Sequence, residues 1–414
     1  MRLRVVATSA VVLVAAVATG VVATPAQAEP AALPDPGENC LPAPETVATA
    51  EPWAQAWLGI GRTWPLTRGA GVTVAVVDTG VAADSPQLSG RVLSGLDLTS
   101  PGGGPADNDC FGHGTFIAGI IGAAPADGTS FHGVAPEVRI LPIRVANSMD
   151  DGTARLLAEG IRAAVDRGAD VVNISASTRA PEPSLLAAVE YAEQRDVVVV
   201  AAAANSAGQG VQVAYPAALP TVVAVGAIDS TGTLAAFSQT GPHLGLTAPG
   251  VEVVSVGPGG PGHWRGSGTS YAVPFVAGVA ALVRAYRPEL SAAQVRHRLL
   301  TTADHPAVAL PDSGYGWGVV NPAAAVSSAL AEEGAAGPAA PAGDARHPDL
   351  PPPDPIGPTL AALAAGLSVV LIGLVALLTV LLPAGRARGW RPAALSSTDR
   401  PDVPDPERSR QRAV

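Results

Sequence analysis

The sequence predicts an α/β domain with a three-layer arrangement, in which a mainly parallel sheet is covered by helices on both faces. Two observations predict it. Between about residues 70 and 330, short and almost wholly apolar runs alternate with longer segments of helical length. The short runs are typical of strands buried on both faces, as in parallel sheets. Strands that alternate with helices favour a sheet sandwiched between two helical layers.

The elements are expected in the following order. Strands are expected at 72–77, 138–141, 171–174, 197–202 and 222–227. Helices are expected at 154–166, 184–194, 271–286 and 292–300. Because sites in such sheets gather at the carboxyl ends of the strands, we expect chemistry directly after these runs.

The composition excludes several classes of protein. The chain has 414 residues and a net charge of −10, and its 25 basic residues are all arginine, which argues against a nucleic-acid partner. Two cysteines are too few for a disulfide scaffold or a Cys-rich zinc module. The glycine-rich stretch 257–262 is not followed by Gly-Lys-Ser/Thr and is expected to be a loop. We expect no metal and no cofactor; residues 107–109 are taken as solvated loop groups rather than calcium ligands.

Both ends of the chain carry long apolar runs. Arg2 and Arg4 precede the run 5–22, and Ala26-Gln27-Ala28 follows, which predicts a secretory signal at 1–28. The alternative is an uncleaved anchor. A second run, 359–382, has no charge and is long enough, at about 1.5 Å per residue, to cross a hydrocarbon core of about 30 Å. The alternative for this run is a buried core helix.

These runs predict a single-pass protein of the cell membrane. Arginines at 386, 388 and 391 follow the second run and predict a cytoplasmic tail, 383–414. The body of the chain would then lie outside the cytoplasm. The Pro-rich segment 331–358 is expected to be a linker between the body and the membrane helix.

Three motifs in the body combine an acid, an imidazole and a hydroxyl. Asp78-Thr79-Gly80 directly follows the first strand, Gly112-His113-Gly114-Thr115 precedes an apolar helical run, and Ser270 opens the uncharged run 271–282. A serine needs a histidine to take its proton, and the imidazole needs a carboxylate to fix its tautomer. The N–H of Ser270 and the side chain of Asn205 are candidate donors to an oxyanion. The motifs therefore predict acyl transfer.

These motifs resemble those of the subtilisin-like serine proteases, or subtilases, whose triad has the order Asp, His, Ser. The resemblance covers 71–330 and includes the C-terminal block 315–322. It implies that Asp78, His113 and Ser270 form the triad, that Asn205 and Ser270 form the oxyanion hole, and that the substrates are proteins or peptides.

A closer resemblance is to the mycosins, the membrane-anchored subtilases of type VII secretion. This resemblance rests on the signal, the extension 29–70 with its tryptophans, the two cysteines, the Pro-rich linker and the terminal apolar run. It implies a type VII secretion complex as a partner. The alternative function is that of a structural partner in such a complex, with catalysis secondary; a diffusing degradative protease and an aspartic protease built on Asp78 and Asp312 are weaker alternatives.

The cleft departs from the subtilase pattern. Subtilases usually have glycine before the oxyanion asparagine, where this chain has Ala204, preceded by Ala203. They usually have Ser-x-Gly where it has Ser175-Ala176-Ser177. The hypothesis is that the pocket is narrow and accepts only small residues, or that activity is low; the alternative is neutral drift. Phe116 replaces a common histidine and is expected to pack within its helix.

The remaining expectations concern the extension and the other histidines. In an oxidising compartment, Cys40 and Cys110 are expected to form a disulfide rather than to stay free thiols. The bridge would hold the extension beside His113, and the extension is expected to wrap the catalytic domain and to be retained. His132, His243 and His263 lie in loop-like stretches and are expected to be solvated.

Overall fold

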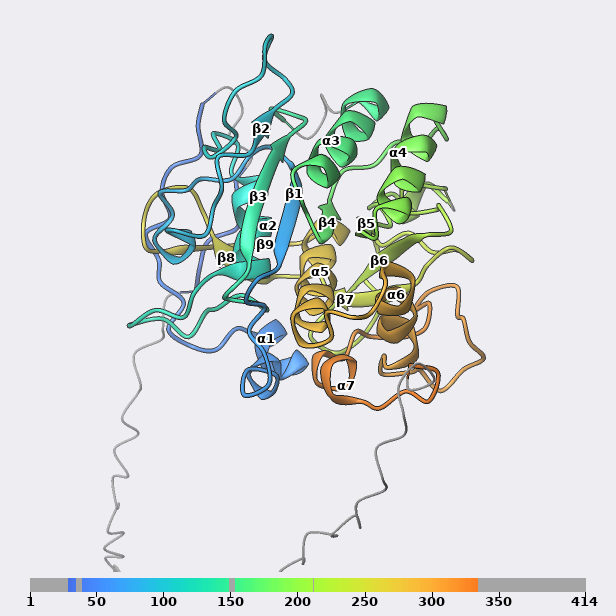
Figure 1. Cartoon of the computed structure of the whole chain (residues 1–414). Helices are drawn as coiled ribbons and strands as arrows, with labels where there is room; N and C mark the ends of the chain where they lie inside the picture. The colour runs from blue at the N-terminus through green and yellow to red at the C-terminus, as the bar shows by residue number, and fades with distance from the viewer. Residues whose placement is uncertain (1–28, 35–38, 149–152, 211, 334–414) are drawn as a thin grey trace, which may run out of the picture. The chain divides into compact units, whose positions relative to one another are not determined.

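A computed structural model describes residues 29–34, 39–148, 153–210 and 212–333 (Figure 1). Its main sheet has seven parallel strands in the order β2-β3-β1-β4-β5-β6-β7. Their bounds are β1 Thr73–Asp78, β2 Leu96–Asp97, β3 Arg139–Arg144, β4 Val171–Ile174, β5 Val198–Ala202, β6 Val222–Ile228 and β7 Leu246–Pro249. A separate antiparallel pair consists of β8 Val253–Val256 and β9 His263–Gly266.

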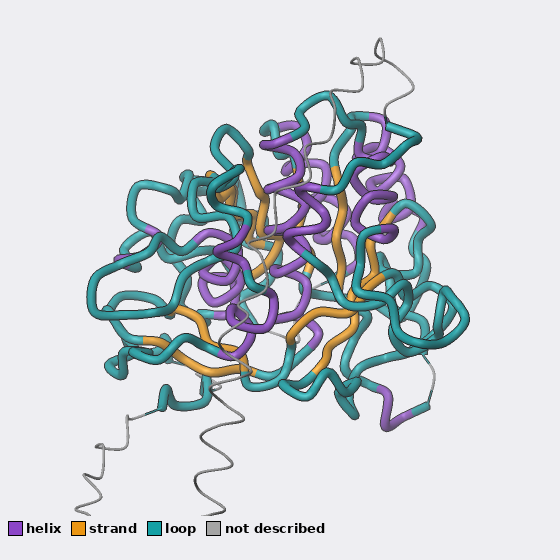
Figure 2. The backbone as a smooth tube through the Cα atoms, turned by 90° about the horizontal axis from the view of Figure 1, so that it is seen from below, coloured by secondary structure: helices purple, strands orange, loops and turns teal. Residues whose placement is uncertain are grey.

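Helices cover both faces of the main sheet (Figures 1 and 2). One face carries α2, His113–Gly122, and α5, Thr269–Tyr286, and the other carries α3, Ala154–Asp166, and α4, Pro183–Gln194. The remaining helices are α1 Trp53–Leu58, α6 Ala292–Thr301 and α7 Pro322–Ser327, with 3₁₀ turns at Ile60–Arg62, Pro86–Leu88 and Ala207–Gln209. The expected three-layer fold is confirmed.

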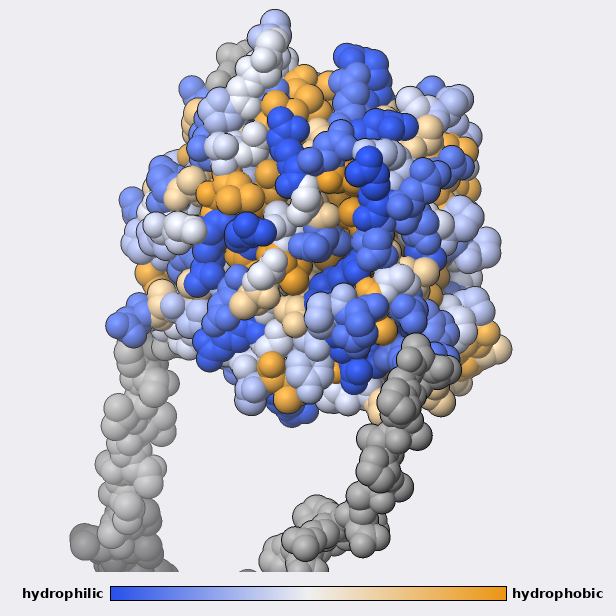
Figure 3. Space-filling model, viewed as in Figure 1, coloured by the Kyte–Doolittle hydropathy of each residue, from blue (hydrophilic) through white to orange (hydrophobic). Residues whose placement is uncertain are grey.

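The alternation of side chains along β1 builds two cores. Val74 and Val76 join the cluster under α2 and α5, whereas Ala75 and Val77 join the cluster under α3 and α4. Successive strand side chains point to opposite faces, so a strand buried on both faces must be apolar throughout. The outward faces of α3 and α4 are polar, and Figure 3 shows hydrophilic residues over them.

The helix that carries Ser270 begins earlier than the sequence indicates. It starts at Thr269, so Pro274 lies inside the helix rather than in its first turn. Proline has no N–H, and the carbonyl four residues before it, that of Ser270, therefore loses its helical donor. This helix is also the one described segment that is long and apolar enough to span a membrane, and it is 83% buried in the core.

The first described part of the extension lies along β9. Leu33 N–H donates to the Arg265 carbonyl, and Arg265 N–H donates to the carbonyl of Ala31. Further along, Gly262 N–H donates to the carbonyl of Pro44. Together with the packing of Ala48, Ala54 and Leu58 into the main core, these bonds show that the extension wraps the domain.

The expectation of solvated histidines was wrong for His263. This residue opens β9 and is 1% exposed. Its Nδ1 accepts the N–H of Ala48, and its Nε2 lies 2.9 Å from Oε1 of Gln87. Burial lowers the pKa of His263 to about 4, so the ring is neutral and joins the extension to the 3₁₀ turn that contains Gln87. His132 and His243 are also partly buried, and burial lowers the pKa of each.

Four of the regions expected from the sequence lie wholly or mostly outside the described residues. These are the signal 1–28, the linker 331–358 beyond its first residues, the apolar run 359–382 and the tail 383–414.

Candidate active site

The carboxyl ends of β1 and β4 form the floor of the site. Asp78 is the last residue of β1 and is buried. One carboxylate oxygen, Oδ1, accepts the N–H of Thr79 at 2.8 Å and lies 2.7 Å from Nδ1 of His113. A carboxylate can only accept, so the Nδ1 of His113 carries the proton and Nε2 is left as the acceptor.

His113 is the first residue of α2 and is also buried. Gly112 before it has φ +86°, and a Cβ there would come within 2.3 Å of Leu41. Burial opposes the charged imidazolium, but the charge and hydrogen bond of Asp78, together with the charge of Asp109, raise the pKa of His113 overall.

Ser270 lies in the first turn of α5 and is joined to Ser175 after β4. Ser270 Oγ donates to the Ser175 carbonyl, and Ser175 Oγ donates to the Ser270 carbonyl, each at 3.1 Å. The second bond replaces the one that Pro274 cannot make. Ser270 and His113 line one cleft of about 290 Å³. The structure thus brings the three predicted residues together, with the hydroxyl turned toward the end of β4.

Asn205 borders the same cleft. Its Oδ1 accepts from the N–H of Thr269 at 2.8 Å and from its hydroxyl at 2.9 Å. These two donors fix the side-chain amide so that the Nδ2 donor is available, and no bond to it occurs within the described residues. The N–H of Ser270 also lies in a first helical turn, where N–H groups lack a helical acceptor. The two predicted oxyanion donors therefore border the space beside Ser270.

Comparison with known proteins identifies the family. Residues 69–318 match the subtilase family. The chain belongs to the subtilase family. Subtilisin DY of Bacillus licheniformis is 42% identical over 261 residues, which are 62% of this chain and 92% of that protein.

Within the subtilases, the chain is related to the mycosins. Mycosin-4 of Mycobacterium tuberculosis is 39% identical over 312 residues, covering 65% of this subtilase and 68% of that protein. The solved structure of a serine protease, MycP1, described as an essential component of the type VII (ESX-1) secretion system, is 32% identical. It superposes with a TM-score of 0.63 and covers 72% of this chain and 100% of its own. The chain is thus a serine protease of the mycosin type.

The predicted cleft residues of this subtilase are only partly assembled. Ser175 and Ala176 line a small cavity together with Asp78 and His113. Ala203 is buried, and Ser177 is exposed. Ala204 has φ +82°, a conformation that glycine adopts freely and alanine rarely. The backbone of this subtilase therefore keeps a glycine-like geometry at that position.

Sequence reasoning missed two further features of the cleft. The ring of Tyr271 packs on the ring of Phe116, with their centroids 4.7 Å apart, and its centroid lies 5.4 Å from that of the His113 ring. Phe116 is fully buried, as expected. Leu33 and Pro34 of the extension line the cleft that holds Ser270. In the sequence, only their position shortly before Cys40 pointed to a place near the site.

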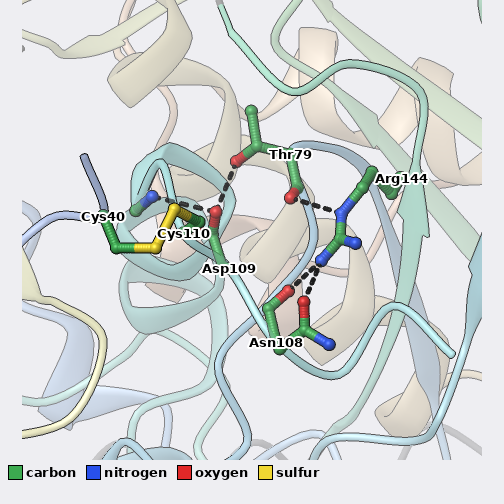
Figure 4. Close-up of a disulfide and its surroundings, with 7 residues drawn as sticks. Cys40, Thr79, Asn108, Asp109, Cys110 and Arg144 are labelled. Atoms are coloured by element: carbon green, nitrogen blue, oxygen red, sulfur yellow. Dashed lines mark hydrogen bonds between the residues drawn. A yellow bond between two sulfur atoms is a disulfide. The ribbon is translucent and has the colours of Figure 1, made fainter. Parts of the chain in front are cut away.

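The expected disulfide joins Cys40 and Cys110 (Figure 4). Leu41 next to it donates its N–H to the carbonyl of Cys110. The bridge therefore ties the extension to the turn that leads into α2 and His113. Within the described residues, no group of three or more His, Cys, Asp or Glu side chains is arranged to hold a metal.

Proposed function

We propose that this subtilase is a membrane-anchored, extracytoplasmic endopeptidase in which Asp78, His113 and Ser270 form the triad. The observation that carries the proposal is the 2.7 Å contact between His113 and Asp78, next to a cleft that His113 and Ser270 both line. It gives a base with a fixed tautomer beside a hydroxyl at a helix N-terminus.

In this mechanism, His113 Nε2 takes the proton of Ser270 as its oxygen attacks the peptide carbonyl. The hydroxyl first turns away from the Ser175 carbonyl, which it meets at 3.1 Å in the free protein. The N–H of Ser270 and Nδ2 of Asn205 stabilise the oxyanion. His113 then protonates the leaving amine, and water hydrolyses the acyl-enzyme by the same route in reverse.

The proposed organisation follows the mycosin relationship. Residues 1–28 are a signal peptide, 29–70 an extension that is retained, and 71–330 the peptidase domain. The segment 331–358 is a linker, 359–382 the membrane helix and 383–414 a cytoplasmic tail. The similarity to MycP1, a component of a type VII secretion system, supports a partner of the type VII kind.

Ser270→Ala in the native host tests the function. We expect loss of peptidase activity with an unchanged amount of folded protein. If secretion also fails, proteolysis is the essential output. If secretion continues and fails only when the whole chain is deleted, the protein acts mainly as a structural partner. Protease added outside intact cells should digest the peptidase domain and spare a tag on the tail; a digested tag would contradict the topology.

A further inference from the structure

The side chain of Asp109 is buried between the end of β1 and the start of α2. Its Oδ1 accepts from Thr79 Oγ1 at 2.9 Å (Figure 4) and from Gly112 N–H at 2.9 Å. Its Oδ2 accepts from the N–H of Thr115 at 2.8 Å and from its hydroxyl at 2.7 Å. Four donors fill the acceptor capacity of a carboxylate.

Both threonine hydroxyls are oriented by a second bond. Thr79 Oγ1 accepts the N–H of Gly114 at 3.0 Å, and Thr115 Oγ1 accepts the N–H of Ala82 at 2.9 Å. Each hydroxyl therefore has its proton left for Asp109. Burial raises the pKa of Asp109, while the hydrogen bonds from Thr115 and Gly112 oppose that rise. Because all four partners donate, the carboxylate form is the one that fits.

These bonds surround both members of the acid–imidazole pair. Gly112 and Gly114 flank His113, and Thr79 directly follows Asp78. The carboxylate of Asp109 thus binds Thr79 and Gly112 directly. Through the hydroxyl of Thr79 it also holds the N–H of Gly114. We propose that Asp109 is a positioning residue for the Asp78–His113 pair, and that its charge also acts on the imidazole.

The groups that face His113 define the electrostatic part of the inference. They are Asp78 from β1, Asp109 from the turn before α2 and the ring of Tyr271 from α5. Burial raises the pKa of Tyr271 further above neutrality, so its phenol stays uncharged. Burial alone would lower the pKa of His113, and both carboxylates raise it. Loss of the Asp109 charge should therefore lower the pKa of His113.

The test is the pH dependence of kcat/KM for Asp109→Asn, which reports the free-enzyme pKa of the base. The inference rests on the proposed catalytic roles of Asp78, His113 and Ser270. We expect kcat to fall by about tenfold or more because the pair is misaligned. We expect KM to change little and the acid limb to move to lower pH. The matched control is Asp170→Asn. The carboxylate of Asp170 accepts the N–H of Thr73 at the other end of β1, so this variant should change neither kcat nor the position of the acid limb.

Unchanged kcat with an unmoved acid limb would overturn the inference, and a fall in kcat with an unmoved limb would overturn its electrostatic part. If Asp109→Asn does not fold, Thr79→Val and Thr79→Ser decide: valine should lower kcat and serine should restore it, and equal rates would overturn the inference. Ser270→Ala is assayed alongside. Activity in Ser270→Ala contradicts the proposed function, whereas an inactive Ser270→Ala with a fully active Asp109→Asn contradicts this inference alone.

Discussion

Ser270 and Ser175 exchange two hydrogen bonds, each hydroxyl donating to the other residue's carbonyl at 3.1 Å. The bond to the Ser270 carbonyl replaces the one that Pro274 cannot make, because proline lacks the N–H that a regular helix would offer to that carbonyl. Asn173 Nδ2 in turn donates to Ser175 Oγ at 3.1 Å, which orients that hydroxyl toward α5. The backbone of Ser270 is thus held in place by residues at the end of β4.

Ser175→Ala should destabilise the fold by about 1–3 kcal/mol, because it leaves the buried Ser270 carbonyl without a donor. Pro274→Ala in the same chain should recover part of that loss, since its N–H can reach the carbonyl. Denaturant unfolding of the two single variants and the double variant measures the coupling. Strictly additive losses would contradict the link between Pro274 and Ser175.

Activity should fall as the pH drops through a midpoint above 6.5. The pKa of His113 is raised in the folded protein, and only the neutral imidazole can take the proton of Ser270. The free energy of unfolding depends on pH in the opposite direction. The bond between the imidazolium and Asp78 stabilises the fold fully below pH 6.5, and this stabilisation is lost as the pH rises through the pKa of His113 in the folded protein. A pH–rate profile and unfolding at several pH values, with His113→Gln as control, measure both. An acid limb well below 6.5 would contradict the assignment.

Replacing Cys40 and Cys110 by serine should lower the free energy of unfolding by about 4 kcal/mol, because the bridge closes a loop with a sequence separation of 70 residues. Guanidinium unfolding with and without reductant measures the loss. The double-serine variant should not respond to reductant. If the native protein is equally unresponsive, the bridge does not contribute to stability.

The cleft should accept small residues before the cut. Ala204 and Ser177 place side chains where subtilases usually have glycine, and Ala204 keeps φ +82°. Profiling with a peptide library should show preference for alanine, glycine or serine over phenylalanine and leucine. The double variant Ala204→Gly, Ser177→Gly should broaden that preference. Efficient cleavage after phenylalanine by the native chain would refute the narrow pocket.

The sequence was most informative where local signals are strong. The expected helix 154–166 and strand 171–174 have the observed bounds, because Thr153 caps the helix and the strand is apolar throughout except for Asn173. The short β7 contains a proline and has the pattern of a loop, and the apolar periodicity of α5 did not show that Thr269 begins it.

Local sequence patterns could not predict contacts between segments that are far apart in the chain. The neutral, buried His263 and the cleft-lining Leu33 depend on the extension meeting β9, two segments far apart in the chain. The three chemical motifs were found because each adjoins a predicted strand or helix, whereas Asp109 resembles an ordinary loop acid until its four donors are known.

The disulfide changes what chain cleavage can accomplish in this protein. A cut anywhere between Cys40 and Cys110 leaves both fragments covalently joined. A mature chain whose new N-terminus lay near Gly71 would therefore still carry the part of the extension that contains Cys40. Two bands on a reducing gel and one on a non-reducing gel would reveal such a nicked but undivided molecule, which N-terminal sequencing alone would mistake for one that had lost its extension.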